Sequence, residues 1–228
     1  MAGNMFRRTP STTSASSSSS SSSSSKSKTV SDNGDSRVSK TVMDLMSCIS
    51  PVTPYLSVSG CLPVCTQTLL SDDYTAAVCC TNGFEYDFPK DRIDYMHIRI
   101  DDCRDTDLRP YFGPVCQMIE KHRLRRRAPG AHGRTLVFCA QGVSRSVSFV
   151  LAYLMIYGKM TLAEAYDLVR QRRRLACPNV GFFKQLIDLE RQVFGRQSVH
   201  MIEPVHGFEV ADVVWKYGDD MLKAFRDM

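Results

Sequence analysis

The chain has 228 residues, 43% of them apolar, and its 29 basic and 24 acidic residues give a net charge of +5. This length suffices for one domain with extensions, and no apolar run reaches the roughly 18 residues that a membrane span needs. We therefore expect no membrane span, and the modest charge gives no reason to expect a nucleic-acid partner.

The start of the chain, MAGNMFRRTP, lacks the apolar segment of a secretory signal. We therefore expect a cytoplasmic protein whose nine cysteines are reduced and mostly buried. Cys61 and Cys65 are close in sequence, but no second Cys/His pair has zinc-finger spacing, so we expect no metal and no cofactor.

Residues 1–40 are rich in serine, have no apolar face to bury and are predicted to form a disordered tail. Order is expected to begin near Thr41. The chain is then predicted to form one domain over residues 41–196 and a C-terminal extension over residues 197–228.

Four short apolar or alternating segments between turn residues are predicted to be strands. They are TPYLSVSG (53–60), YTAAVCC (74–80), RIDYMHIRI (92–100) and TLVF (135–138). The third strand leads into the acidic loop DDCRDTD, and the fourth follows the basic loop RLRRRAPGAHGR with its proline and glycine breakers.

Helices are expected over about residues 108–124 and in three later segments. After TLVF, apolar residues recur at helical spacing at Val147, Val150, Leu151, Leu154 and Met155. The capping box TLAE, residues 161–164, opens the next helix. Its apolar face is Leu162, Ala165, Tyr166 and Val169, and CPNVGFFKQLIDLERQVF gives the last long helix.

Strands that come first and then alternate with helices predict an α/β domain with a central, mostly parallel sheet flanked by helices. In such sheets, sites lie beyond the carboxyl ends of the strands. The acidic loop after Ile100 and the loop after Phe138 would both lie there, so we expect them to share one cleft.

The pattern Cys-x5-Arg after Phe138 predicts a phosphate-binding loop between strand and helix. Backbone N–H groups of such a loop, together with the helix N-terminus, bind an anion and favour a thiolate at Cys139. Arg145 adds a planar fork for two phosphate oxygens, and Ser146 could donate its hydroxyl to the departing sulfur. The loop itself is Ala140, Gln141, Gly142, Val143 and Ser144.

Phosphoryl transfer to a thiolate also needs an acid. The acidic loop offers four candidates, Asp101, Asp102, Asp105 and Asp107.

The segments CAQGVSRS, AYLM and PNVGFFKQLIDLE, in this order and spacing, resemble the dual-specificity protein phosphatases over about residues 45–195. The segment VHMIEPVHGFEVADVV resembles the C-terminal extension of a small atypical subgroup of single-domain members. The resemblance implies hydrolysis of phosphotyrosine and of phosphoserine or phosphothreonine. It also implies phosphorylated proteins as partners, with members of MAP kinase pathways as a family expectation.

The resemblance also assigns roles to individual residues. Cys139 matches the nucleophile that forms a phosphocysteine, Arg145 the phosphate-binding arginine, and Ser146 the hydroxyl that assists phosphoenzyme breakdown. In the family the acid lies six residues before the leucine of an L-x-x-Y-F segment. That segment is LRPYF here, which makes Asp102 the acid, with Asp101 and Asp105 as alternatives.

Phe138 departs from the family, which has a histidine at this position that bonds to nearby backbone. The absence of this histidine predicts a weaker catalyst that keeps its nucleophile, arginine and acid. The alternative is a pseudophosphatase that binds phosphorylated partners without turnover.

Two other enzyme classes use a similar loop. A lipid or RNA phosphatase is a third interpretation, but lipid-directed members often carry lysines in the loop, and this loop has none. A rhodanese-like sulfurtransferase is a fourth, but the segments AYLM and PNVGF favour the phosphatase.

Two further features have alternative interpretations. The basic run 121–127 could be a nuclear signal, which would add a nuclear location, or a dock for acidic partners; we favour a solvated helix end. Cys79 or Cys80 could form a reversible disulfide with an oxidised Cys139, as in some related enzymes; we favour packing in the core of the strand.

Overall fold

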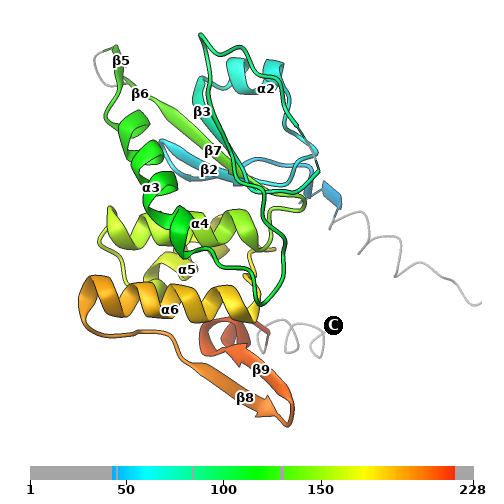
Figure 1. Ribbon diagram of the computed structural model, residues 1–228, viewed down its shortest axis with the longest axis vertical. Coiled ribbons are helices and arrows are strands. Elements are labelled where there is room, and N and C mark those ends of the chain that lie inside the picture. Colours follow the sequence, from blue (N-terminus) through cyan, green and yellow to red (C-terminus); the bar gives the residue numbers. More distant parts are fainter. Residues whose placement is uncertain (1–42, 45, 84, 129–130, 219–228) are drawn as a thin grey trace, which may run out of the picture.

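The computed structural model describes residues 43–218, except residues 45, 84 and 129–130 (Figure 1). The predicted tail of residues 1–40 lies outside this range. The described elements are β1 (Ser50–Thr53), β2 (Leu56–Ser59), α2 (Thr66–Ser71), β3 (Tyr74–Cys79), β4 (Asp94–His97), α3 (Arg109–Arg123), β5 (Arg126–Ala128), β6 (Ala131–His132), β7 (Arg134–Phe138), α4 (Arg145–Ile156), α5 (Leu162–Arg172), α6 (Val180–Phe194), β8 (Met201–Val205) and β9 (Phe208–Ala211).

The central sheet has five strands in the order β1-β2-β7-β3-β4. β2, β7, β3 and β4 pair in parallel, whereas β1 pairs with β2 antiparallel. The predicted α/β class with a mostly parallel sheet is confirmed. The segment TPYLSVSG, predicted as one strand, begins in a turn at Pro54 and Tyr55, so β1 and β2 form a hairpin.

Helices cover both faces of the sheet unequally (Figure 1). α3, α4 and α5 pack on one face, and α6 packs on α4, while the short α2 contacts β3 from the other face. The larger hydrophobic cluster lies on the side of α3–α6 and includes Cys139. A smaller cluster on the side of α2 includes Phe138. Successive side chains of a strand point to opposite faces, which is why these neighbours belong to different clusters.

The predicted helices form close to their expected limits. α3 is capped by Leu108 and Leu124, the two limits expected from the sequence. At the start of α5, the capping box between Thr161 and Glu164 is present in both directions. The residues predicted to form the apolar face of α5 are all buried.

Some segments carry more structure than the sequence pattern indicated. The basic loop before β7 contains the small antiparallel hairpin β5–β6. After α6, the hairpin β8–β9 and a helical segment over residues 212–218 follow. Buried Glu190 accepts hydrogen bonds from the backbone N–H and hydroxyl of Ser198, and the Tyr217 hydroxyl donates to Asp167 at 2.9 Å. The described part of the extension therefore packs on the helical layer, and the boundary near residue 196 stays a prediction.

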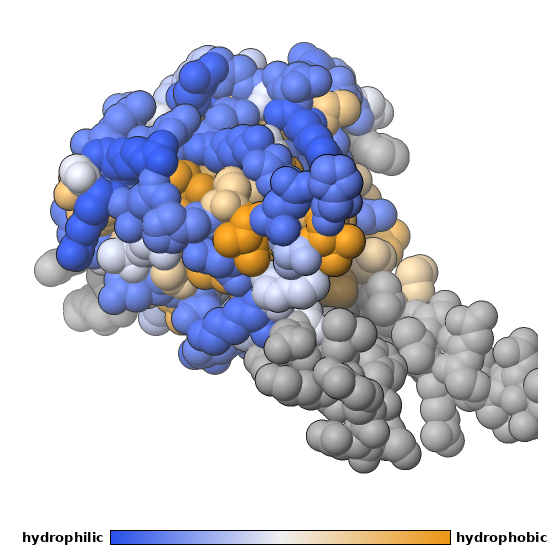
Figure 2. All heavy atoms as spheres, turned by 90° about the horizontal axis from the view of Figure 1, so that it is seen from below, coloured by the Kyte–Doolittle hydropathy of each residue, from blue (hydrophilic) through white to orange (hydrophobic). Residues whose placement is uncertain are grey.

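The surface on the side of α6 and the C-terminal hairpin is mostly hydrophilic, with a few hydrophobic residues near its middle (Figure 2). No helix in the described ranges combines the length and apolarity that crossing a bilayer requires. All nine cysteines are free thiols, but only Cys79, Cys80, Cys116 and Cys139 are buried. The expectation of mostly buried thiols is therefore wrong, because loops and the cap of α2 hold exposed cysteines.

Candidate active site

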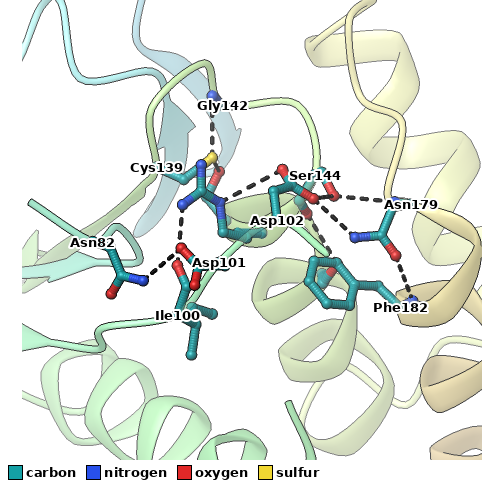
Figure 3. A network of polar contacts seen from close by, with 12 residues as sticks. Asn82, Ile100, Asp101, Asp102, Cys139, Gly142, Ser144, Asn179 and Phe182 are labelled. Atoms are coloured by element: carbon teal, nitrogen blue, oxygen red, sulfur yellow. Dashed lines mark hydrogen bonds and ion pairs between the residues drawn. The ribbon is translucent and has the colours of Figure 1, made fainter. Parts of the chain in front are cut away.

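Cys139 lies at the base of a tight loop between the end of β7 and the start of α4 (Figure 3). Its side chain is buried. The Sγ atom accepts a hydrogen bond from the backbone N–H of Gly142 at 3.2 Å and lies 3.2 Å from the Ser146 hydroxyl. Hydrogen bonds from an N–H group and a hydroxyl stabilise a thiolate. The structure therefore brings the predicted nucleophile and the predicted hydroxyl into contact.

All four carbonyls between Cys139 and Ser144 accept hydrogen bonds from groups outside the loop. The Ala140 carbonyl accepts from the N–H of Cys61 at 3.2 Å, and the Val143 carbonyl accepts from the N–H of Cys177 at 2.8 Å. The carbonyls of Gln141 and Gly142 accept from the side chain of Arg173 at 2.9 and 2.6 Å. Since a trans peptide holds its C=O and N–H on opposite sides, carbonyls fixed outward favour N–H groups that face the centre of the loop.

Both the backbone conformation and the close approach of β2 require a glycine at position 142. Its φ of +69° lies in the left-handed region, and a Cβ atom would come within 2.3 Å of the Ser59 backbone. Glycine adopts this conformation without steric cost. The loop therefore packs against the end of β2 while remaining tight enough to enclose an anion.

Arg145 begins α4 and reaches across the mouth of the loop. Its side chain is only 12% exposed, and Nη1 donates to the Ile100 carbonyl at 3.1 Å. Nε lies 3.5 Å from Oδ2 of Asp102, which makes an ion pair. That separation leaves this buried nitrogen with no hydrogen-bond partner among the described residues. An anionic ligand would supply one.

Asp102 is the acidic residue that lines the Cys139 cavity. The cavity holds about 250 Å³ and is lined by Asp102, Cys139, Ala140, Gln141, Val143, Ser144 and Arg145. Oδ1 of Asp102 accepts hydrogen bonds from the Ser144 hydroxyl at 2.7 Å and from Nδ2 of Asn179 at 2.9 Å. The carboxylate is thus held in place by Ser144 and Asn179, the residues that precede α4 and α6 (Figure 3).

The other acidic candidates do not line this cavity. Asp101 accepts a hydrogen bond from Nδ2 of Asn82 at 2.5 Å. Asp105 is exposed. Asp107 pairs with Arg109, which lowers the pKa of the Asp107 carboxyl, as a nearby cation does. Of the four candidates, the structure brings Asp102 to Cys139.

The segment PNVGFFKQL contributes more than a helix start. The Asn179 side chain caps α6 through Oδ1 and binds Asp102 through Nδ2. A Cβ atom on Gly181 would come within 1.9 Å of the Arg104 carbonyl, so only glycine allows the acidic loop to approach α6. Gln185 binds the backbone of the same loop at both Thr106 and Leu108. The sequence analysis predicted a helix in this segment but gave Asn179 no role and no sign of its contact with Asp102.

Replacing Asn179 with alanine is expected to slow the reaction about 10- to 100-fold, because a residue that holds a reacting group acts at that scale. Because Asn179 orients the acid, the loss should also be larger for alkyl phosphates, whose poor leaving groups need a proton, than for aryl phosphates. Steady-state rates for one alkyl and one aryl phosphate measure both effects.

Asn82→Ala is the matched control, because it removes the corresponding contact to Asp101. It should leave the ratio of alkyl to aryl rates unchanged. An unchanged ratio in Asn179→Ala, or an equal change in Asn82→Ala, would refute the assignment of Asn179 to Asp102.

Phe138 lies in the apolar core behind the loop. Its side chain is fully buried, and its ring meets Tyr86 edge-on at a centroid distance of 5.0 Å. Because Cys139 faces the other cluster, a side chain at position 138 acts on the thiol only through the backbone. Phe138 therefore stabilises the fold through packing on the α2 side of the sheet.

The two neighbouring cysteines differ in their surroundings. Cys80 shares the larger cluster with Cys139, and complete burial raises its pKa well above the usual range. Cys79 lies in the smaller cluster with its Sγ atom 3.3 Å from the Thr81 hydroxyl, and burial raises its pKa. Both thiols pack in the core, and their pairing with an oxidised Cys139 stays a prediction.

A larger cleft of about 410 Å³ lies between the start of β4 and the end of α3. Its charged lining carries both signs, and Cys139 does not take part. At its edge, Lys121 pairs with Asp94 at 2.8 Å, and in the same basic run Arg123 pairs with Glu120 at 2.6 Å. Part of the basic run is therefore neutralised within the fold.

Comparison with known proteins identifies relatives of this chain. The family model of the dual specificity phosphatase catalytic domain matches residues 62–192. A Caenorhabditis elegans protein without an assigned function is 40% identical over 167 residues, which cover 73% of this chain and 54% of that protein. Human dual specificity protein phosphatase 14 is 42% identical over 125 residues, which cover 55% of this chain and 60% of the relative. The chain thus spans less than two thirds of the length of these relatives.

Among solved structures, human DUSP28 is similar at 26% sequence identity with a TM-score of 0.57. The match covers 64% of this chain and 97% of that one. The similarity supports a shared phosphatase fold for the two chains.

Proposed function

This chain belongs to the dual-specificity phosphatase family, and on that premise we propose that it hydrolyses phosphotyrosine and phosphoserine or phosphothreonine in proteins through Cys139. The observation that carries the proposal is the loop geometry. Four outward-bonded carbonyls leave N–H groups facing a cavity that has Cys139 at its base and Asp102 and Arg145 at its rim.

In the first step, the Cys139 thiolate attacks phosphorus in line with the ester oxygen. The S–P bond forms as the P–O bond breaks, and Asp102 gives its proton to the departing oxygen. Arg145 and the loop N–H groups bind the three non-bridging oxygens, where charge is concentrated. In the free protein, hydrogen bonds from Ser144 and Asn179 hold the Asp102 side chain at the rim of the cavity.

In the second step, water attacks the phosphocysteine. Asp102, now ionised, takes a proton from that water, the P–S bond breaks, and inorganic phosphate leaves. The sulfur departs as a thiolate, which the Ser146 hydroxyl and the Gly142 N–H stabilise by hydrogen bonds. No metal ion takes part in either step.

The proposed substrates are phosphorylated proteins, and MAP kinase pathway members are candidates among them. The Cys139 cavity, with a volume of about 250 Å³, is large enough for a phosphate group. The direct test is phosphate release by the full chain from peptides that carry either phosphotyrosine or phosphothreonine, in the presence of a chelator. Release from both supports the proposal, and release from neither in any peptide context contradicts it.

A pseudophosphatase that holds phosphorylated partners is the second candidate, and Phe138 is the observation that favours it. We expect Phe138→His to lower stability by about 1–3 kcal/mol, because a polar ring enters an apolar cluster. The same change should raise turnover by no more than about 10- to 100-fold, since it acts through the backbone. Thermal unfolding and steady-state turnover provide the two readouts.

Phe138→Leu is the control that keeps the position apolar, and its turnover should match that of the wild-type protein. If the wild-type protein binds phosphopeptides without turnover and Phe138→His creates it, the pseudophosphatase candidate replaces the phosphatase.

A further inference from the structure

Arg173 is a buried arginine directly behind the Cys139 loop. It follows the last residue of α5, and only 2% of its surface is exposed. Nε donates to the Gly142 carbonyl at 2.6 Å, and Nη2 donates to the Gln141 carbonyl at 2.9 Å. One guanidinium thus binds two of the four loop carbonyls.

The two peptide units that Arg173 binds carry the N–H groups of Gly142 and Val143. The Gln141 carbonyl shares a peptide plane with the N–H of Gly142, which donates to Sγ of Cys139 at 3.2 Å. The Gly142 carbonyl shares its plane with the N–H of Val143, which lines the cavity. Because C=O and N–H point in opposite directions in a trans peptide, the bonds from Arg173 orient the Gly142 N–H toward the Cys139 sulfur and the Val143 N–H toward the cavity.

The other edge of the guanidinium is fixed to the start of the domain. Nη1 donates to the Cys48 carbonyl at 3.2 Å and to the Ser50 hydroxyl at 3.1 Å. Ser50 is the first residue of β1. The planar fork of an arginine can satisfy acceptors on two sides at once, whereas the point charge of lysine cannot. The position of the guanidinium is therefore set from outside the loop.

Burial and charge act together at this position. Burial lowers the pKa of Arg173, and the nearby Cys139 opposes that shift because a thiolate favours a neighbouring cation. An arginine remains protonated even in such surroundings. A fixed positive charge behind the loop therefore favours both the thiolate and a bound anion.

We propose that Arg173 is a positioning residue for phosphate binding: it holds the peptide units before Gly142 and Val143 so that the Gly142 N–H faces the Cys139 sulfur and the Val143 N–H faces the phosphate oxygens. The inference rests on the proposed phosphatase function. It adds a residue that does not touch substrate, and it links the geometry of the loop to the segment around Ser50.

The test measures binding of inorganic phosphate by calorimetry, in full-length protein that carries Cys139→Ser and therefore cannot turn over. Adding Arg173→Lys should weaken phosphate binding about tenfold or more, because two N–H donors lose their alignment. Arg172→Lys is the matched control, since Arg172 is the exposed neighbour at the end of α5, and it should leave the affinity unchanged. With Cys139 intact, Arg173→Lys should raise KM and lower kcat together.

Equal phosphate affinity in the Arg173 and Arg172 variants would overturn the inference, even if Arg173→Lys lowers the unfolding temperature, because the role would then be structural. If Arg173→Lys does not fold, Ser50→Ala provides the second variant. It removes one acceptor of the guanidinium and should weaken phosphate binding by a smaller factor; an unchanged affinity there would overturn the inference. If the wild-type chain shows no turnover while phosphate binding in the Cys139→Ser protein still depends on Arg173, the proposed function is refuted and this inference stands.

Discussion

Replacing Cys139 with serine is expected to abolish phosphate-ester hydrolysis while leaving the binding of inorganic phosphate in place. A serine hydroxyl at this site is not ionised at neutral pH, so the nucleophile is lost. The loop N–H groups and Arg145, which bind the phosphate oxygens, do not depend on the sulfur. Turnover should fall to background, and calorimetry should still detect phosphate.

Cys116→Ser is the matched control, because Cys116 is another buried cysteine and lies on α3, outside the cavity. It introduces the same hydroxyl into the core, and its turnover should follow only its loss of stability. Turnover that persists in Cys139→Ser would show that Cys139 is not the nucleophile.

The second large effect is expected for Asp102→Asn. Asparagine retains an Oδ1 atom that can accept from the Ser144 hydroxyl, but it cannot give a proton to the leaving oxygen. General acid catalysis contributes about 10²- to 10⁴-fold, and the loss should be largest for alkyl phosphates, whose leaving groups are poor. Rates for one alkyl and one aryl phosphate, measured side by side, separate this effect from a general loss of activity.

Asp101→Asn and Asp105→Asn are the controls, since both residues lie in the same loop but outside the cavity. Each should keep the ratio of alkyl to aryl rates of the wild-type protein. A normal ratio in Asp102→Asn together with a reduced ratio in either control would move the acid to that residue.

The parts of the site that the sequence predicted are those encoded by short stretches. Cys139, Gly142 and Arg145 belong to one loop, whose strand and helix follow from local apolar patterns. Asp102 came from a family offset. The structure places it in the lining of the Cys139 cavity, and its role as the acid stays a prediction. The capping box at Thr161 was predictable for the same reason, because both partners lie within one helical turn.

The residues that the sequence did not reveal act across long separations. Asn179 meets Asp102 over 77 positions, and Arg173 meets the Gln141 carbonyl over 32. A cap asparagine or a basic helix end has an ordinary local explanation, so neither pattern indicates such a contact. These contacts exist because α5 and α6 pack close to the loop, which is a property of the tertiary fold.

The sequence pattern also did not predict where each strand begins and ends or how β1 and β2 pair. The hairpin β1–β2 depends on a turn at Pro54 and Tyr55 inside a segment that reads as one strand. Phe138 likewise reads as a lost polar group when compared with the family. Only its contact with Tyr86 shows what the side chain does in this core.

The central claim is that phosphate passes through a covalent bond to Cys139. The most direct measurement is mass spectrometry of protein rapidly quenched in acid during turnover of an aryl phosphate, with Ser146→Ala used to slow breakdown of the intermediate. We expect one phosphoryl group on the peptide that contains Cys139, present during turnover and absent when substrate is exhausted. Product release without a phosphoryl group on Cys139, or with the group on another residue, would contradict the mechanism.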